Sequence, residues 1–177
     1  MGRNKMLLAL DGEPLVRRAA RHALAAGLSP VVVVLGHEAA QVREALADLD
    51  VVFAENPDFQ GPTSTSLQKG IERVPREARG AVVLLGDMVK VTDHMLTALA
   101  ITARRTVAPL VASRYGDVVA PPFYFDRRLF SELAAWTGEG AGPGLVERHP
   151  GDVVYVDWPE DCLADVDTPE DLERLSG

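Results

Sequence analysis

Valine-rich apolar runs alternate along this chain with longer stretches in which apolar and polar positions recur at a helical spacing. Two of the runs, residues 30–35 and 81–85, contain no polar residue, which is typical of strands that are buried on both faces. Less regular runs predict further strands at residues 51–54, 107–113, 118–125 and 153–156, with Pro121-Pro122 breaking the third of these. This alternation of strands and helices predicts βα units and a mainly parallel sheet.

The stretches between these strands are predicted to be helical. They comprise residues 14–26, 38–49, 63–74, 93–104 and 126–136, and a short helix that ends near His149 after the glycine-rich loop 138–144. Pro14 and Gly27 mark the two ends of the first helix. Thr92 and the hydroxyl groups of residues 63–66 are expected to act as N-caps of the helices that they introduce.

Length and composition predict a single domain over residues 1–177. The chain is 47% hydrophobic, which is enough for one sizeable core, and no repeat or long linker divides it. Its formal net charge of -8 argues against a nucleic-acid backbone as partner, because phosphate binding requires a basic surface. Arginines of the helical stretches, such as Arg17 and Arg18, are interpreted as parts of solvated faces.

The sequence favours a location in the cytoplasm. Cys162 is the single cysteine, so an internal disulfide is excluded, as expected in a reducing compartment. No apolar run reaches the ~20 residues that a membrane-spanning helix needs. A signal peptide is not indicated either, because Arg3 and Lys5 precede only a five-residue apolar stretch. We therefore expect a cytoplasmic protein without a membrane partner.

Gly86-Asp87 directly follows the second fully apolar run. Ligands of open α/β sheets bind at the carboxyl ends of the strands, where an aspartate can reach a cation that bridges phosphates. Asp165 and Asp167 add two further carboxylates at strand spacing, and we favour Asp165 as the metal ligand. The alternatives are that Asp87 occupies an ordinary turn and that Asp167 caps the helix that begins at Thr168.

Lys5 is the candidate for a positive charge on substrate phosphates. It follows Gly2 and Asn4 and precedes a strand-like run, Met6 to Leu10. A lysine beside a phosphate loop stabilises the charge that develops during phosphoryl transfer. By itself, a lysine near an N-terminus is more often an ordinary surface residue. Residues 63–66 are further candidates for contacts to a nucleobase or ribose, although helix capping explains them equally well.

Taken together, these motifs resemble the MobA-like nucleotidyltransferases, the group that contains molybdenum cofactor cytidylyl- and guanylyltransferases. The matching stretches, in chain order, are Met1-Gly2-x-Asn4-Lys5, Asp11-Gly12-x-Pro14-Leu15, Val31 to His37, Asn56-Pro57 through Ser64-Thr65-Ser66-Leu67, Gly86-Asp87, and Asp165-x-Asp167-Thr168-Pro169-Glu170-Asp171-Leu172. The resemblance implies a three-layer α/β, Rossmann-like nucleotidyltransferase fold.

The family begins with a strand and a Leu-Ala-Ala-Gly-x-Ser-x-Arg loop before the Met-Gly pair, and here Met1 occupies that methionine position. We therefore expect an N-terminally truncated form in which the first strand, central in the family's sheet, is missing. The neighbouring strands would then have unpaired backbone groups and a gap beside them. Because the loop supplies amides and an arginine to the triphosphate, the chain as written is expected to be inactive or poorly stable.

By the same resemblance, an acceptor phosphate attacks the α-phosphate of a nucleoside triphosphate and pyrophosphate is released. Lys5 and Asp87 would be catalytic, and Asp87 and Asp165 would hold Mg²⁺. The residues implied in nucleotide binding are Gly2, Asn4, Lys5, Asn56, Ser64, Thr65, Gly86 and Asp87. CTP is the favoured donor and a molybdopterin-type phosphate the favoured acceptor, with a molybdoenzyme as a further implied partner.

Two other functions remain open. The first is a catalytically inactive module that binds a cofactor or partner in a pocket around Phe123 and Trp136. The second is a sugar-transferring enzyme of related fold, which would usually carry an Asp-x-Asp motif after the central strand. The sequence Gly86-Asp87-Met88-Val89 lacks that motif. Ala120-Pro121-Pro122 stands where the family often has Gly-His-Pro, and this difference bears on the identity of the acceptor.

Overall fold

The computed structural model describes residues 4–164. Its strands are β1 (Ala9–Leu10), β2 (Glu13–Pro14), β3 (Val31–Leu35), β4 (Val51–Glu55), β5 (Gly80–Val83), β6 (Leu110–Tyr115), β7 (Val118–Asp126) and β8 (Val153–Trp158). The α-helices are α1 (Leu15–Ala25), α2 (Ala39–Ala45), α3 (Thr63–Ile71), α4 (Asp93–Thr106), α5 (Phe130–Ala135) and α6 (Ala141–Arg148). Short 3₁₀ helices are η1 (Lys5–Leu7), η2 (Arg127–Leu129) and η3 (Glu160–Cys162).

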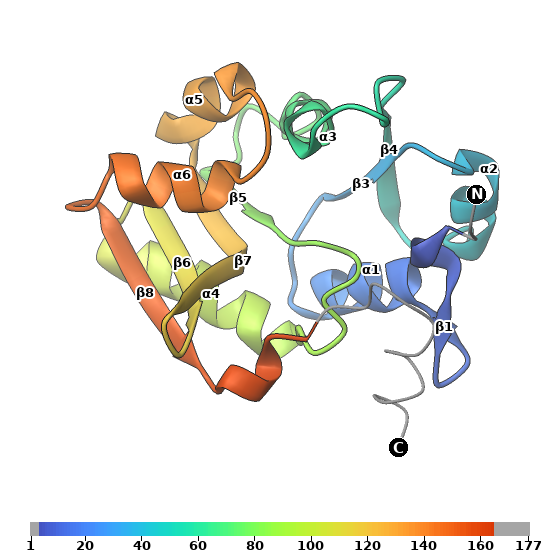
Figure 1. The fold of residues 1–177 in the computed structure, drawn as a ribbon, viewed down its shortest axis with the longest axis horizontal. Coiled ribbons are helices and arrows are strands. Elements are labelled where there is room, and N and C mark those ends of the chain that lie inside the picture. The colour runs from blue at the N-terminus through green and yellow to red at the C-terminus, as the bar shows by residue number, and fades with distance from the viewer. Residues whose placement is uncertain (1–3, 165–177) are drawn as a thin grey trace.

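The α/β fold class and its three layers are confirmed. Strand β3 pairs in parallel with β4, and a second sheet has the order β5-β7-β6-β8. In that sheet β6 and β8 are parallel, whereas β7 runs antiparallel to both of its neighbours. Strands β1 and β2 form a small antiparallel hairpin outside these sheets. Figure 1 shows β3 and β4 on the right with α1 and α2, and the four-stranded sheet on the left.

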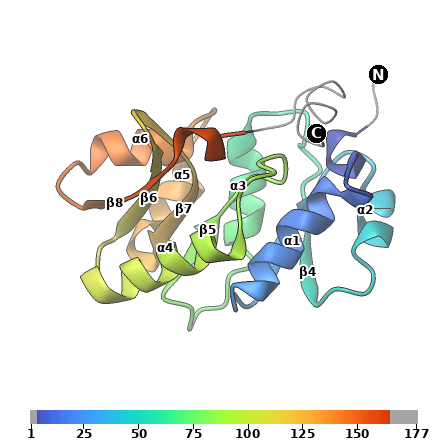
Figure 2. The ribbon, with the colours of Figure 1, turned by 90° about the horizontal axis from the view of Figure 1, so that it is seen from below.

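Helices cover both faces of the strands, as Figures 1 and 2 show from two directions. On one face, Phe123 and Phe125 of β7 pack with Leu133 of α5 and Leu145 of α6. On the other face, Leu99 of α4 packs with Val111 of β6, and Val16 of α1 packs with Leu35 of β3 and Val42 of α2. Helix α3 lies on the first face, where Leu67 and Ile71 contact the same cluster as Phe123.

The sheet is divided between β3 and β5. Within residues 4–164, β3 pairs only with β4, and β5 pairs only with β7, so each has one unpaired edge. Both strands were expected to be fully buried, but residues 32–34 and the whole of β5 are only partly buried, and Leu85 is 45% exposed. That expectation was wrong because an apolar run is buried only when a neighbouring strand covers its edge.

Pro121-Pro122 does not break the seventh strand. Strand β7 continues through the two prolines, and its pairing with β6 only shifts register between Ala112 and Arg114. The Ser113 hydroxyl donates a hydrogen bond to the carbonyl of Pro122 (2.8 Å), and the Tyr115 hydroxyl donates to that of Pro121 (2.9 Å). Side chains thus satisfy the carbonyl groups that the register shift removes from the ladder.

The hydroxyl groups of residues 63–66 do not cap α3. The N-cap position is Pro62, and the Glu139 carboxylate accepts hydrogen bonds from the Thr63 N–H (3.0 Å) and the Thr63 hydroxyl. The Ser64 N–H donates to the carbonyl of Gly138 (3.3 Å). A distant loop therefore caps this helix, placing a negative charge at its positive end. By contrast, Thr92 caps α4 as expected, accepting from the Met95 N–H (3.4 Å).

Candidate functional site

An ion pair joins the two residues that the sequence singled out for chemistry. The Lys5 ammonium lies 2.5 Å from Oδ2 of Asp87. Lys5 belongs to η1, and Asp87 belongs to the loop that follows β5, so the pair forms at the carboxyl end of that strand. The lysine side chain is 39% exposed and the aspartate side chain 13% exposed. The site thus opens to solvent on the side of the lysine.

The second carboxylate oxygen of Asp87 is buried and has no hydrogen-bond partner within the described residues. The next residues in the loop, Met88 and Val89, are each only 6% exposed. An unpartnered buried oxygen is costly, and a carboxylate oxygen is the ligand that Mg²⁺ and other hard cations prefer. The residues present therefore fit a divalent cation at this oxygen.

Met6 and Gly86 explain why η1 lies so close to this loop. A Cβ atom at residue 86 would lie 2.8 Å from Sδ of Met6, so a larger residue there would require the Met6 side chain to shift. The run Met6 to Leu10, interpreted as a strand, begins instead as the 3₁₀ helix η1, because the Met6 N–H donates to Asn4 Oδ1 (3.1 Å). This turn brings Lys5 toward Asp87.

Asn4 links the site to the neighbouring strand. Its Nδ2 donates a hydrogen bond to the carbonyl of His37 (2.9 Å), in the loop after β3. The His37 ring lies beside the Phe59 ring, with centroids 6.0 Å apart, and Phe59 remains 41% exposed. The ends of β3, β4 and β5 thus form one edge. Sequence reasoning missed Phe59, and its position in a loop dense in turn residues gave little signal of this exposed location.

The predicted nucleotide contacts Asn56, Ser64 and Thr65 lie together at the end of β4. Asn56 is 3% exposed; its Nδ2 donates to the hydroxyls of Thr65 and Ser66 (both 2.9 Å), and its Oδ1 accepts from the Asp58 N–H (3.0 Å). Ser64 is equally buried, at 3%. The Asn56 and Thr65 side chains hold the loop 56–62 against α3, so their contribution to binding would be to shape this edge.

Two predicted site residues, Gly2 and Asp165, lie outside the described residues, as does the alternative metal ligand Asp167. Between residues 4 and 164, no three His, Cys, Asp or Glu side chains gather as a metal-binding group. In the same part of the chain, no helix is long and apolar enough to cross a membrane.

The pocket expected around Phe123 and Trp136 is filled by these side chains. Phe123 is 2% exposed, and a Cβ at Gly142 would clash with its ring. The Trp136 ring occupies the corresponding space beside Gly144, and the Arg148 guanidinium lies 4.4 Å from its centroid. These aromatic rings are therefore parts of the packing between β7, α6 and the preceding loop.

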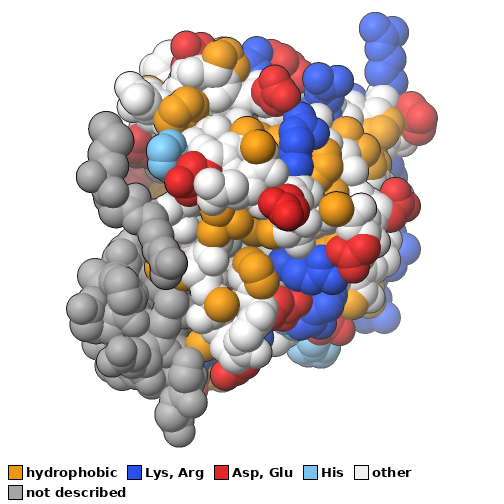
Figure 3. Space-filling view, turned by 90° about the vertical axis from the view of Figure 1, so that its right-hand side faces the viewer, with side chains coloured by type: hydrophobic (Ala, Val, Ile, Leu, Met, Phe, Trp, Pro, Cys, Tyr) orange, Lys and Arg blue, Asp and Glu red, His pale blue; other side chains and the backbone are white. Residues whose placement is uncertain are grey.

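Figure 3 shows the face formed by the right-hand side of Figure 1, where α2 and β1 lie. Lysine and arginine side chains alternate there with aspartate and glutamate side chains, and hydrophobic atoms lie between them. A surface of mixed charge is not the continuous basic stripe that a nucleic-acid backbone requires.

Comparison with known proteins assigns the chain to a family. A model of the MobA-like NTP transferase domain matches residues 1–153. The bifunctional protein GlmU of Chromobacterium violaceum is 34% identical over 120 residues, which cover 65% of this chain and 26% of that protein. The chain thus spans about a quarter of the length of that GlmU.

Solved structures extend this similarity over almost the whole chain. Rv0371c from Mycobacterium tuberculosis H37Rv is 30% identical, with a TM-score of 0.84 over 99% of this chain and 90% of its own. A structure of Rv0371c in complex with manganese is 32% identical, with a TM-score of 0.74 over 98% of this chain and 92% of its own. The recognised family and the nucleotidyltransferase type of fold are thereby confirmed.

Proposed function

The chain belongs to the family of MobA-like NTP transferase domains, and on that premise we propose that it is a nucleotidyltransferase. It transfers a nucleoside monophosphate from a nucleoside triphosphate to the phosphate of a small-molecule acceptor. The observation that carries this proposal is the Lys5–Asp87 pair at the carboxyl end of β5, in which one buried oxygen of Asp87 has no partner among the described residues.

In the proposed reaction, an oxygen of the acceptor phosphate attacks the α-phosphorus in line. The new P–O bond forms as the bond from the α-phosphorus to the bridging oxygen breaks, and that oxygen leaves with pyrophosphate. No protein nucleophile is needed, because positioning and electrostatic stabilisation contribute most of the catalysis. The Lys5 ammonium contributes positive charge beside the phosphates and is half open to solvent, so a substrate can reach it.

We propose Mg²⁺ as the cofactor, held by Oδ1 of Asp87 and by Asp165. When bound, the cation would offset charge on the substrate phosphates. The unpartnered, buried state of Oδ1 supports the first ligand, and manganese in the Rv0371c complex supports a divalent cation in a relative. Asp165 is proposed from the sequence alone.

The residues proposed to shape the nucleotide site fall into three groups. Gly86 leaves room for the Met6 side chain of η1 beside the loop that carries Asp87, and Asn4 fixes the start of η1 to the loop after β3. Asn56 and Thr65 hold the loop after β4, and Ser64 is buried at the start of α3. Gly2 is proposed from the family motif alone. This division predicts that Lys5 and Asp87 contact substrate or metal, and that the others position them.

We further propose CTP as the donor, a molybdopterin-type phosphate as the acceptor, and a molybdoenzyme as recipient of the product. Support for CTP comes from the sequence resemblance at residues 31–37 and 63–67, and support for the acceptor and the recipient comes from the family resemblance as a whole. The alternative of an inactive binding module loses its expected pocket, because the Phe123 and Trp136 rings fill that space.

The test is transfer from each of CTP, GTP, UTP and ATP, with Mg²⁺, to a molybdopterin phosphate and to a set of sugar 1-phosphates. The protein would be the chain preceded by a strand and a Leu-Ala-Ala-Gly-x-Ser-x-Arg loop, and mass spectrometry would identify the product. A cytidylylated molybdopterin is expected. Transfer to a sugar phosphate alone would overturn the proposed acceptor but leave the reaction class standing. Absence of any nucleotide adduct would refute the reaction class.

A further inference from the structure

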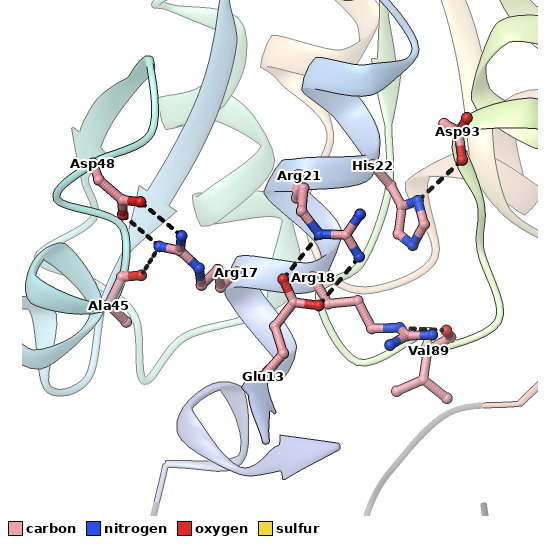
Figure 4. A network of polar contacts seen from close by, with 9 residues as sticks. All are labelled: Glu13, Arg17, Arg18, Arg21, His22, Ala45, Asp48, Val89 and Asp93. Atoms are coloured by element: carbon pink, nitrogen blue, oxygen red, sulfur yellow. Dashed lines mark hydrogen bonds and ion pairs between the residues drawn. The ribbon is translucent and has the colours of Figure 1, made fainter. Parts of the chain in front are cut away.

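Polar side chains of α1 contact three different parts of the molecule, as Figure 4 shows. Arg17 faces α2, where its guanidinium contacts both carboxylate oxygens of Asp48 and the carbonyl of Ala45. Arg21 pairs with Glu13 of β2, and this hydrogen bond lowers the pKa of the Glu13 carboxyl. The helical arginines were interpreted as solvated, but Arg17 and Arg21 fix α1 to the elements beside it.

Arg18 and His22 face the segment that carries Asp87. Arg18 Nε donates a hydrogen bond to the carbonyl of Val89 (3.3 Å), two residues after Asp87. One helical turn later, Nδ1 of His22 lies 3.2 Å from Oδ1 of Asp93 and accepts a hydrogen bond from the Asp93 N–H (3.3 Å). Helix α1 therefore contacts this segment near Asp87 and again where α4 begins.

The segment 86–91 depends on such contacts because it has little regular structure of its own. Among the described residues, one hydrogen bond joins two backbone groups of this segment, from the Val91 N–H to the carbonyl of Met88 (3.2 Å). Apolar packing against α1 is incomplete, since a cavity of about 10 Å³ lies between Leu15, Arg18 and His22 on one side and Gly86 and Val89 on the other. A cavity of this size is near the lower limit for one water molecule.

We propose that Arg18 is a positioning residue, which holds the segment 86–91 so that the Asp87 carboxylate faces Lys5. Helix α1 can do this because its start is tied to the same 3₁₀ turn that carries the lysine: the Leu15 N–H donates to the carbonyl of Leu8 (2.9 Å), and the Leu8 N–H to that of Lys5 (3.1 Å). One rigid helix thus sets the positions of both partners of the ion pair. This inference rests on the proposed function in one respect: it takes Asp87 to be the cation ligand.

Arg17 and Arg18 offer a matched pair for the test. Hydrogen exchange would be followed in the metal-free chain for Arg18→Gln and for Arg17→Gln, which removes the same guanidinium one residue away but on the face toward α2. Arg18→Gln is expected to speed amide exchange in residues 86–91 about tenfold, the effect of losing one hydrogen bond from a charged donor. Arg17→Gln is expected to leave this segment at the wild-type rate, and Arg18→Lys to recover most of the protection.

A second measurement separates positioning from general destabilisation. Electron paramagnetic resonance of free Mn²⁺ should show an about tenfold weaker affinity in Arg18→Gln, as for the loss of an outer-shell contact, with the wild-type affinity retained in Arg17→Gln. Unchanged exchange in residues 86–91 of Arg18→Gln, or equal effects of the two glutamine variants, would overturn the proposal. If the wild-type chain bound no Mn²⁺, the proposed cation site would fail, whereas the exchange data would still decide the role of Arg18.

Discussion

At the scale of single residues, the Lys5–Asp87 pair is better arranged for chemistry than for stability. A lysine that is 39% exposed gains little from an ion pair, because water and salt screen the attraction. The buried oxygen of Asp87 that lacks a described partner carries a desolvation cost without a compensating hydrogen bond. Arrangements of this kind persist where a ligand supplies the missing interaction, which is why we place the reaction here.

Asp87→Asn tests the proposed role of the Asp87 carboxylate as a cation ligand. The amide keeps the shape of the side chain but cannot offer the charge that a divalent cation requires. Mn²⁺ affinity is expected to fall by about 100-fold or more, the effect of removing a main electrostatic contact, while the urea midpoint of the metal-free chain changes little. Asp117→Asn, in the exposed turn between β6 and β7, is the control. Equal Mn²⁺ binding by Asp87→Asn and wild type would remove Asp87 from the proposed site.

Gly36→Ala tests the packing of the neighbouring loop. A Cβ atom at residue 36 would lie 2.5 Å from Cβ of Phe59, so the alanine is expected to destabilise the chain by about 1–3 kcal/mol through overpacking. Phe59→Gly in the same chain should remove most of this penalty, since the clashing Cβ atom and the ring beyond it are gone. Urea unfolding of the two single variants and the double variant measures the coupling. Additive effects would contradict the described contact.

At the scale of elements, the ion pair between Arg17 of α1 and Asp48, just after α2, has a predictable pH dependence. The hydrogen bond from Arg17 lowers the pKa of the exposed Asp48 to about 2, from an ordinary value of 3.8. A lowered folded-state pKa gives stability that is present above the ordinary value and lost as pH falls through the folded one. The difference in urea midpoint between wild type and Asp48→Asn should therefore be constant above about pH 5 and disappear toward pH 2. A difference that persisted at pH 2 would contradict the ion pair.

Much of the element order could be predicted from local pattern, but contacts between distant segments could not. The apolar runs predicted the positions of β3 and β5 in the sequence, and Thr92 predicted where α4 begins. Local pattern did not show that β3 and β5 each have one unpaired edge within residues 4–164, because burial depends on a strand from elsewhere in the sheet. Nor could it show that Glu139 caps α3, since the two segments are far apart in sequence.

The candidate site was predictable to a similar degree. Lys5 and Asp87 were found because each follows a motif with a chemical role, and the structure brings them together. Arg18 was missed because helical periodicity does not reveal that its face meets the loop after β5. Asp165 lies outside the described residues and stays a prediction.

At the scale of the whole molecule, the divided sheet is the dominant feature. Two apolar strands, β3 and β5, have unpaired edges within the described residues, and both are partly exposed. Unpaired strand edges cost stability and invite pairing with other chains. The expectation that the 177-residue chain is poorly stable stays a prediction.

Adding a strand ahead of Met1 tests this account of stability. A fused segment of five apolar residues, followed by the Leu-Ala-Ala-Gly-x-Ser-x-Arg loop, should pair with both free edges. Fully burying even two valine or leucine side chains contributes about 3 kcal/mol or more, which corresponds to a rise in Tm of roughly 6–12 °C. A control with two prolines in the segment, which cannot donate to a ladder, should show no rise. Equal Tm values for both fusions would contradict pairing at this position.

The most direct test of the central claim is the release of pyrophosphate from CTP, with Mg²⁺ and acceptor, by the extended chain and its Asp87→Asn variant. We predict turnover by the extended chain, a loss of about 100-fold or more in the variant, and little turnover by the 177-residue chain alone. Failure of the extended, folded chain to release pyrophosphate from any nucleoside triphosphate and acceptor tested, or equal rates with and without Asp87, would contradict the account.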